Sequence, residues 1–134
     1  MKILCTICAR GGSKGVKNKN IKNFKGKPLI YHTISQKKKV KKFTKIVCSS
    51  DSKTILKIAK KNKVDYVLPR PHFLSNHKVE KLKVIKHCLI NSEKYFKIKF
   101  DYIVDLDVTA PLRSNNDIKK IINLISKKRN VDNI

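Results

Sequence analysis

The sequence predicts an α/β domain, a three-layer sandwich in which helices cover both faces of a mostly parallel sheet. Short runs rich in Ile, Val and Cys alternate with longer segments whose apolar residues recur at helical spacing. This alternation is typical of parallel strands joined by crossover helices. The 134 residues suffice for one core without disulfides or metal. No apolar run approaches the roughly 20 residues of a membrane span. We therefore expect a single cytoplasmic domain, residues 1–134.

Two strands and two helices are predicted in the first half of the chain. Residues 2–9, "KILCTICA", precede glycines and predict a buried strand. Residues 27–39 predict a helix that tolerates Pro28 in its first turn. Its apolar face comprises Leu29, Ile30, Thr33 and Ile34. Residues 45–51 predict the second strand. The next helix is capped by Ser50, Asp51 or Ser52 and has the apolar face Ile55, Ile58, Ala59 and Asn62.

The second half repeats the pattern. Residues 65–69, "DYVLP", predict a short strand stopped by prolines, and residues 79–96 predict a helix. Residues 101–108 predict a strand, and residues 114–129 predict a helix whose basic end complements the helix dipole. The apolar face of the helix at 79–96 comprises Val79, Leu82, Ile85 and Leu89. That of the helix at 114–129 comprises Ile118, Ile121, Ile122 and Ile125. Asn115 or Asn116 is the predicted cap of this second helix.

Every predicted strand is followed by residues that carry chemistry. The four segments are "ARGGSKG", "SSDS", "RPHFLS" and "DLDVTAPLR". In open parallel sheets, ligands bind outside the carboxyl ends of the strands. The ligand site is therefore expected where these four segments meet.

The loop at residues 9–20, "ARGGSKGVKNKN", matches neither the Walker pattern nor GxGxxG. Its glycines allow successive backbone N–H groups to converge on an anion. Arg10 can hold a phosphate in a bidentate way, Lys14 and Lys19 can neutralise a triphosphate, and Ser13 can add a hydrogen bond. The alternative is a mobile basic loop in a chain full of lysine. The position after the first strand favours phosphate binding.

The formal net charge of +24 has two interpretations. A strongly basic chain suits a nucleic-acid partner. However, only four of the 33 basic residues are arginine and only 7% of residues are aromatic, whereas base readout and stacking favour both types. Lys, Ile and Asn are the residues that an AT-rich genome over-uses, so codon bias is the favoured interpretation and a nucleic-acid-binding module is the alternative.

The cysteines and histidines do not predict a metal centre. Cys5 and Cys8 form a CxxC without a second pair, and on a strand their side chains point to opposite faces. We expect small buried cysteines in a reducing compartment. The histidines are His32, His72, His77 and His87, and none has ligand spacing.

The carboxylates of "DLD", Asp105 and Asp107, would share one face of a strand, which suits a common cation. The alternative is that one of them caps a turn or pairs with a lysine. Asp107 is the candidate metal or sugar contact.

The segment "ICARGGSKGVKNKNIKNFKGKPLIYHTI" closely resembles the opening motif of the acylneuraminate cytidylyltransferases, which include the CMP-sialic acid synthetases. "IVCSSDS", "RPHFLS" and "YIVDLDVTAPLR" follow in the family's order. The resemblance implies a nucleotide-diphospho-sugar transferase-like fold and transfer of CMP from CTP to a 2-keto sugar acid, with release of pyrophosphate. It also implies Mg2+ as cofactor and a place in surface polysaccharide biosynthesis.

The same resemblance assigns site residues. The nucleotide-binding residues it implies are Arg10, Gly11, Gly12, Ser13, Lys14, Lys19, Asn20 and Arg70. Arg10 and Lys19 are also the implied catalytic residues, Arg70 holds the base side of the nucleotide, and Asp107 stands near the sugar and the metal where relatives often carry glutamine. His77 and Glu80 replace the aspartate and small hydroxyl residue that the family usually has.

The family's chains run well beyond residue 134. We therefore expect this nucleotide-binding domain to be incomplete and truncated at its C-terminus. The principal magnesium aspartates, sugar contacts and a dimerisation element would lie further on, and a homodimer is expected if the full-length chain exists. The alternatives are an inactive remnant that only binds nucleotide, and the nucleic-acid-binding module.

Overall fold

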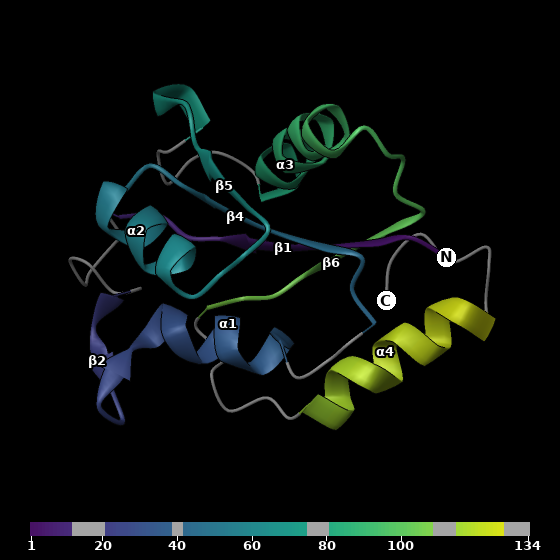
Figure 1. Cartoon of the computed structure of the whole chain (residues 1–134), viewed down its shortest axis with the longest axis horizontal. Coiled ribbons are helices and arrows are strands. Elements are labelled where there is room, and N and C mark those ends of the chain that lie inside the picture. The colour runs from purple at the N-terminus through teal and green to yellow at the C-terminus, as the bar shows by residue number, and fades with distance from the viewer. Residues whose placement is uncertain (12–20, 39–41, 75–80, 109–114, 128–134) are drawn as a thin grey trace.

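The computed structural model describes residues 1–11, 21–38, 42–74, 81–108 and 115–127. Within them a four-stranded parallel sheet has the order β5-β4-β1-β6 (Figure 1). Its strands are β1 (Ile3–Cys8), β4 (Lys45–Ser50), β5 (Tyr66–Pro69) and β6 (Tyr102–Asp105). The central strand β1 places Cys5 opposite Ile46 on one side and opposite Val104 on the other.

Helices cover both faces of this sheet. The helices are α1 (Leu29–Lys38), α2 (Lys53–Lys61), α3 (Lys81–Phe96) and α4 (Asn115–Lys127). In Figure 1, α1, α2 and α4 lie on one face and α3 lies on the other. The predicted three-layer α/β sandwich with a parallel sheet is therefore confirmed.

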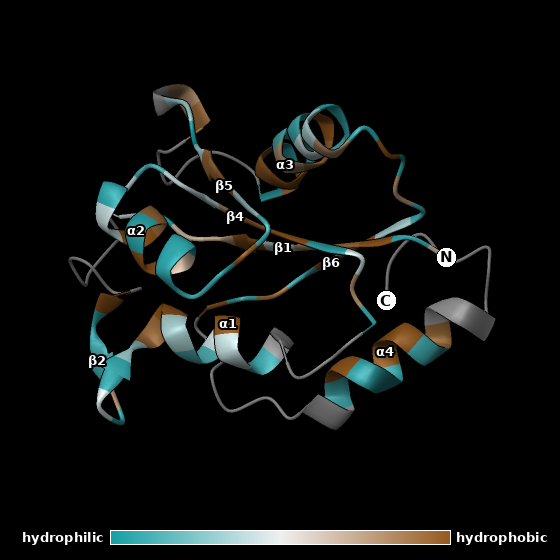
Figure 2. Ribbon diagram, viewed as in Figure 1, coloured by the Kyte–Doolittle hydropathy of each residue, from teal (hydrophilic) through white to brown (hydrophobic). Residues whose placement is uncertain are grey.

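Two cores, one on each face, hold the layers together. The larger core joins β1 residues such as Ile3 and Ile7 to Ile34 of α1, Ile55 of α2 and Ile118 of α4. The smaller core beneath α3 comprises Leu4, Val47, Leu68 and Cys88. Figure 2 shows the hydrophobic strands between helices whose outer faces are hydrophilic. Burying large aliphatic side chains such as these stabilises the fold by about 1.5–3 kcal/mol each.

The predicted helix at 27–39 starts later than expected, because a short hairpin precedes it. Strand β2 (Asn23–Phe24) pairs antiparallel with β3 (Lys27–Pro28). The turn residues Lys25 and Gly26 have φ of 51° and 83°, the positive values that a two-residue I′ turn requires. The expectation that Pro28 occupies the first helical turn was wrong. The predicted inner residues Ile30, Thr33 and Ile34 are buried.

The predicted inner face of helix α3 was wrong at Leu82, whose side chain is 75% exposed. The buried residues of α3 are Val84, Cys88 and Ser92. Two of these are small, which lets the helix approach the sheet closely. Ile85 and Leu89 lie half-buried beside this face. The expected Val79 lies outside the described residues.

Helices α2 and α4 follow their apolar patterns in part. Ser52 is the N-cap of α2, with its side chain accepting a hydrogen bond from Ile55 N, so one of the three proposed caps is confirmed. In α4, Ile118 and Ile122 are buried but Ile121 is 36% exposed. The two proposed caps of α4, Asn115 and Asn116, belong to its first helical turn.

The remaining differences between prediction and structure concern where the elements end and one short turn. Strand β6 ends at Asp105, earlier than the predicted 101–108, and a 3-10 turn, η2 (His72–Leu74), follows β5. None of the described helices is both long and apolar enough to cross a bilayer.

Candidate functional site

The carboxyl ends of the strands meet at one edge of the sheet, and backbone hydrogen bonds continue beyond the strands there. Ala9 N donates to Ser49 O at 2.9 Å, Arg70 N donates to Ser50 O at 2.8 Å, and Leu106 N donates to Thr6 O at 2.9 Å. The first residues after β1, β5 and β6 are therefore held in fixed register. This is the edge at which an open parallel sheet binds its ligands.

The start of the glycine-rich loop is attached to the N-terminus of α2. Gly11 N donates to Asp51 Oδ1 at 2.8 Å. A Cβ built on Gly11 would lie 2.9 Å from Ser52 Cβ, closer than real Cβ atoms approach. Gly11 is therefore required by a close approach of two chain segments, and the entrance of the loop is hydrogen-bonded to Asp51, the residue before the cap Ser52.

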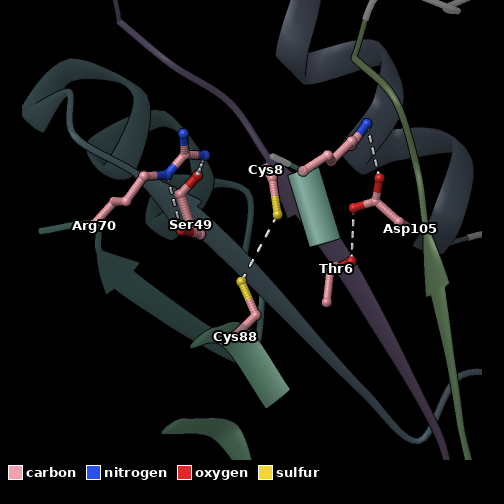
Figure 3. A network of polar contacts seen from close by, with 7 residues as sticks. Thr6, Cys8, Ser49, Arg70, Cys88 and Asp105 are labelled. Carbon is pink, nitrogen blue, oxygen red and sulfur yellow. Dashed lines mark hydrogen bonds and ion pairs between the residues drawn. The ribbon is translucent and has the colours of Figure 1, made fainter. Parts of the chain in front are cut away.

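The guanidinium of Arg70 is buried at the same edge, where the residue is 8% exposed. Arg70 Nη2 donates to Ser49 O at 3.3 Å and Nε lies 3.5 Å from Ser49 Oγ (Figure 3). Among the described residues, no acidic side chain forms an ion pair with Arg70. A buried cation needs anionic or strongly polar partners, and the position of Arg70 at the ligand edge suits such a ligand.

Asp105, at the end of β6, forms a second polar network on the other side of β1 from Ser49. Its Oδ1 accepts a hydrogen bond from Thr6 Oγ1 at 2.7 Å, and its Oδ2 lies 2.9 Å from Lys81 Nζ (Figure 3). Burial alone would lower the pKa of Lys81, but the hydrogen bond and charge of Asp105, with the charge of Asp107, raise it overall. The alternative that one carboxylate of "DLD" pairs with a lysine is confirmed for Asp105.

Asp107 lies two residues beyond β6 and is exposed, between the buried Leu106 and Val108. Its charge acts on Lys81. In the part of the chain that the structure describes, no group of three or more His, Cys, Asp or Glu side chains is arranged to hold a metal ion. An exposed carboxylate at this edge fits the way magnesium binds in phosphate sites, through one or two carboxylates together with substrate phosphates.

The cysteines occupy both faces of the sheet. Cys5 and Cys48 belong to the larger core, whereas Cys8 and Cys88 belong to the α3 side. The predicted opposite orientation of Cys5 and Cys8 is confirmed. Cys8 Sγ lies 3.7 Å from Cys88 Sγ, a contact that the sequence pattern did not indicate.

The structure places four of the predicted site residues. Arg10 and Gly11 follow β1, Arg70 follows β5, and Asp107 follows β6, all at the carboxyl edge. The other predicted site residues lie outside the described residues: Gly12, Ser13, Lys14, Lys19 and Asn20.

Sequence reasoning missed the roles of Ser49 and Asp51, which hold Arg70 and Gly11. The signal was present in "SSDS", because these polar residues follow a strand at the ligand edge.

The parallel sheet places this protein in the class of open α/β proteins, which bind ligands at the carboxyl edge of the sheet. Here the tethered Gly11 and the buried Arg70 lie at that edge. Residues 4–133 match the cytidylyltransferase family. The chain belongs to that family, and the resemblance found in its sequence is confirmed.

Curated relatives support the assignment. Post-translational flagellin modification protein B of Campylobacter coli is 46% identical over 132 residues, which are 98% of this chain and 56% of that protein. CMP-N,N'-diacetyllegionaminic acid synthase of Campylobacter jejuni is 47% identical over 109 residues, which are 81% of this chain and 46% of that protein. The chain thus spans about half the length of these relatives.

A solved structure shows the same fold. CMP:2-keto-3-deoxy-manno-octonic acid synthetase, determined in complex with CTP, superposes with a TM-score of 0.77 at 17% identity. The match covers 98% of this chain and 50% of that one.

Proposed function

We propose that this protein activates a 2-keto sugar acid with CTP, giving a CMP-sugar and pyrophosphate. The observation that carries the proposal is the buried Arg70, which has no acidic partner among the described residues and lies at the same edge as the tethered Gly11. We take CTP as the nucleotide because the chain belongs to the cytidylyltransferase family.

In the proposed reaction, the anomeric hydroxyl oxygen of the sugar acid bonds to the α-phosphorus of CTP. The bond from that phosphorus to the oxygen shared with the β-phosphorus breaks, pyrophosphate leaves, and the hydroxyl proton is released to solvent. Such transfers depend mainly on positioning and charge neutralisation. Arg10 and Lys19 neutralise the phosphates as the catalytic residues, with Gly11, Gly12, Ser13, Lys14 and Asn20 completing the phosphate-binding loop. Arg70 binds the base side of the nucleotide.

Magnesium is the proposed cofactor, with Asp107 as the residue of this chain that would contact it. When bound, the ion would neutralise phosphate charge. The exposed position of Asp107 beyond β6 is compatible with this role.

The sugar acid is proposed from the relatives. The Campylobacter jejuni relative is named for N,N'-diacetyllegionaminic acid, and an Escherichia coli relative, 32% identical over 123 residues, is named N-acylneuraminate cytidylyltransferase. A sialic-acid-like 2-keto acid is therefore the proposed substrate class. The competing proposal is that the protein is an inactive remnant that only binds nucleotide.

The nucleotide assignment is tested by protection of the loop from a protease. Limited digestion after the lysines of residues 12–20 is followed by mass spectrometry, with CTP and magnesium present or absent. We expect CTP to protect the loop and the double variant Lys14→Ala/Lys19→Ala to lose this protection. Lys17→Ala is the matched control, because Lys17 lies in the same loop but has no assigned role, and it should be protected like the wild type.

Equal protection by ATP, GTP and a DNA duplex would contradict the cytidine assignment. Tight duplex binding that weakens steeply with salt would favour the nucleic-acid-binding module instead.

A further inference from the structure

Two thiols that the proposed reaction does not use face each other between β1 and α3, on one face of the sheet. Cys8 ends β1 and Cys88 lies on α3, and their sulfur atoms are 3.7 Å apart although 80 residues separate them in the chain (Figure 3). No disulfide joins any of the four cysteines, all of which are described. A disulfide needs about 2.05 Å between sulfurs, so the two atoms must approach by only about 1.6 Å.

The two thiols differ in exposure. Cys88 is fully buried, whereas Cys8 is partly exposed at the end of its strand. Cys5 and Cys48 lie in the core on the opposite face, so the sheet separates them from this pair. A reagent from solvent therefore reaches Cys8 first, and Cys88 is the neighbour that can react with it next.

The pKa values of the two thiols are shifted in opposite directions. The hydrogen bond with Cys8 lowers the pKa of Cys88, helped by Ser49 and the charge of Arg70 and opposed by burial. The same hydrogen bond, together with burial, raises the pKa of Cys8. Either sulfur can donate in this contact, so a thiolate on one of them is stabilised by the thiol of the other, and a thiolate is the species that attacks a disulfide sulfur.

We propose that Cys8 and Cys88 form a reversible disulfide by exchange with a low-molecular-weight disulfide, and that its formation weakens nucleotide binding at Arg70. Cys8 loses its proton and attacks the reagent as a thiolate; the reagent's S–S bond breaks, and the leaving sulfur takes up that proton as the first thiol. Cys88 then loses its proton and attacks the Cys8 sulfur of the mixed disulfide, and the second leaving sulfur takes up that proton as the second thiol. The two cysteines are oxidised, and the reagent is reduced to two thiols.

The link to the nucleotide passes through Ser49 and rests on the proposed function. Ser49 lies opposite Cys8 in the register of β1 and β4, and Ala9 N, next to Cys8, donates to Ser49 O. The hydroxyl and carbonyl oxygens of Ser49 in turn contact the Arg70 guanidinium. Drawing Cys8 toward Cys88 shifts this end of β1 against β4, so Ser49 holds Arg70 less well. Loss of one such hydrogen bond corresponds to a fall in CTP affinity of about three- to tenfold.

The test uses the double variant Cys5→Ala/Cys48→Ala, in which Cys8 and Cys88 are the remaining cysteines. The protein is incubated with glutathione disulfide, titratable thiols are counted, and CTP binding is measured by calorimetry. We expect both thiols to disappear, tryptic peptides 3–10 and 87–94 to become linked, and CTP affinity to fall as stated. Dithiothreitol should reverse all three changes. If the double variant does not fold, the linked peptides are sequenced by mass spectrometry in the wild type.

Adding Cys88→Ala to the same background provides the control. This variant can form only a mixed disulfide on Cys8, and its CTP affinity should respond less to oxidation. The disulfide is disproved if both thiols stay titratable or the reaction stops at a mixed disulfide. A linked pair with unchanged CTP affinity would refute the connection to Arg70. Absence of CTP binding in both redox states refutes that connection together with the proposed function, while the thiol count still decides the disulfide.

Discussion

Gly11 shows how a single residue determines where the candidate phosphate loop begins. Its N–H is held by Asp51, and the space that a Cβ would occupy is filled by Ser52. Both contacts are made to residues that directly precede α2. The loop entrance is therefore positioned by the β4–α2 junction rather than by the loop itself.

Replacing Gly11 by alanine should destabilise the protein, because Ser52 must move to admit the new Cβ. Overpacking of this kind costs about 1–3 kcal/mol, measured as the free energy of unfolding in urea. The same substitution in a Ser52→Gly background should cost less than half as much. Glycine is a tolerated N-cap that costs only a few tenths of a kcal/mol, so the background itself remains folded. An equal cost in both backgrounds would show that the contact with Ser52 does not matter.

At the scale of the elements, two helices end without the glycine that usually stops a helix. Lys63, after α2, has φ of 61°, and Lys97, after α3, has φ of 57°. A lysine in this left-handed region is strained by about 1–2 kcal/mol, whereas glycine adopts it freely.

Substituting Lys63 by glycine should therefore raise the free energy of unfolding by about 0.5–1 kcal/mol, after allowing for the added entropy of the unfolded chain. Lys57 is the matched control, since it is also exposed but lies inside α2. Lys57→Gly should lower stability by about 1 kcal/mol. Changes of the same sign in thermal or chemical unfolding of the two variants would argue against the strain at Lys63.

Helix α3 also carries a group that links stability to pH. Burial, and secondly the charge of Arg70, lower the pKa of His87 below 6.5. Its Nδ1 is buried and has no hydrogen-bond partner among the described residues. Below pH 6.5 the unfolded chain therefore binds a proton that the folded chain resists, so stability falls as pH drops from 6.5 toward the lowered folded-state value.

His87→Gln should flatten this part of the profile. The measurement is the free energy of unfolding between pH 5 and 7.5 for both proteins. The slope is the informative quantity, since the variant can differ in stability at every pH. An unchanged slope would assign the effect to another group.

At the scale of the whole molecule, several acidic side chains of the described residues hold backbone N–H groups, whereas most of the described lysines are exposed. Asp65, Asp101 and Glu93 accept hydrogen bonds from the backbone N–H groups of Ile46, Lys2 and Phe100. Exposed lysines occur on α2 and α4 on one face of the sheet and on α3 on the other. Nucleic-acid-binding proteins typically gather their basic residues on one face or along one stripe, whereas the described lysines are spread over both sides of the sheet. This distribution favours codon bias as the source of the +24 charge.

The elements that sequence reasoning placed correctly are those determined by local pattern, such as the buried residues Ile30 and Ile34 and the cap Ser52. The errors arose where tertiary packing decides. On α3, small Cys88 rather than large Leu82 faces the sheet, because a small side chain permits close approach. The bond between Gly11 and Asp51 joins residues 40 positions apart, and no periodicity in a sequence reports such a contact.

The measurement that tests the central claim most directly is pyrophosphate release by the full gene product from CTP and magnesium, across a panel of 2-keto sugar acids. The account predicts release that depends on the sugar acid, requires CTP rather than ATP or GTP, and falls at least tenfold in Lys19→Ala but not in Lys17→Ala. Tight CTP binding without release from any sugar acid in the panel would contradict the proposed activity and leave a protein that only binds nucleotide.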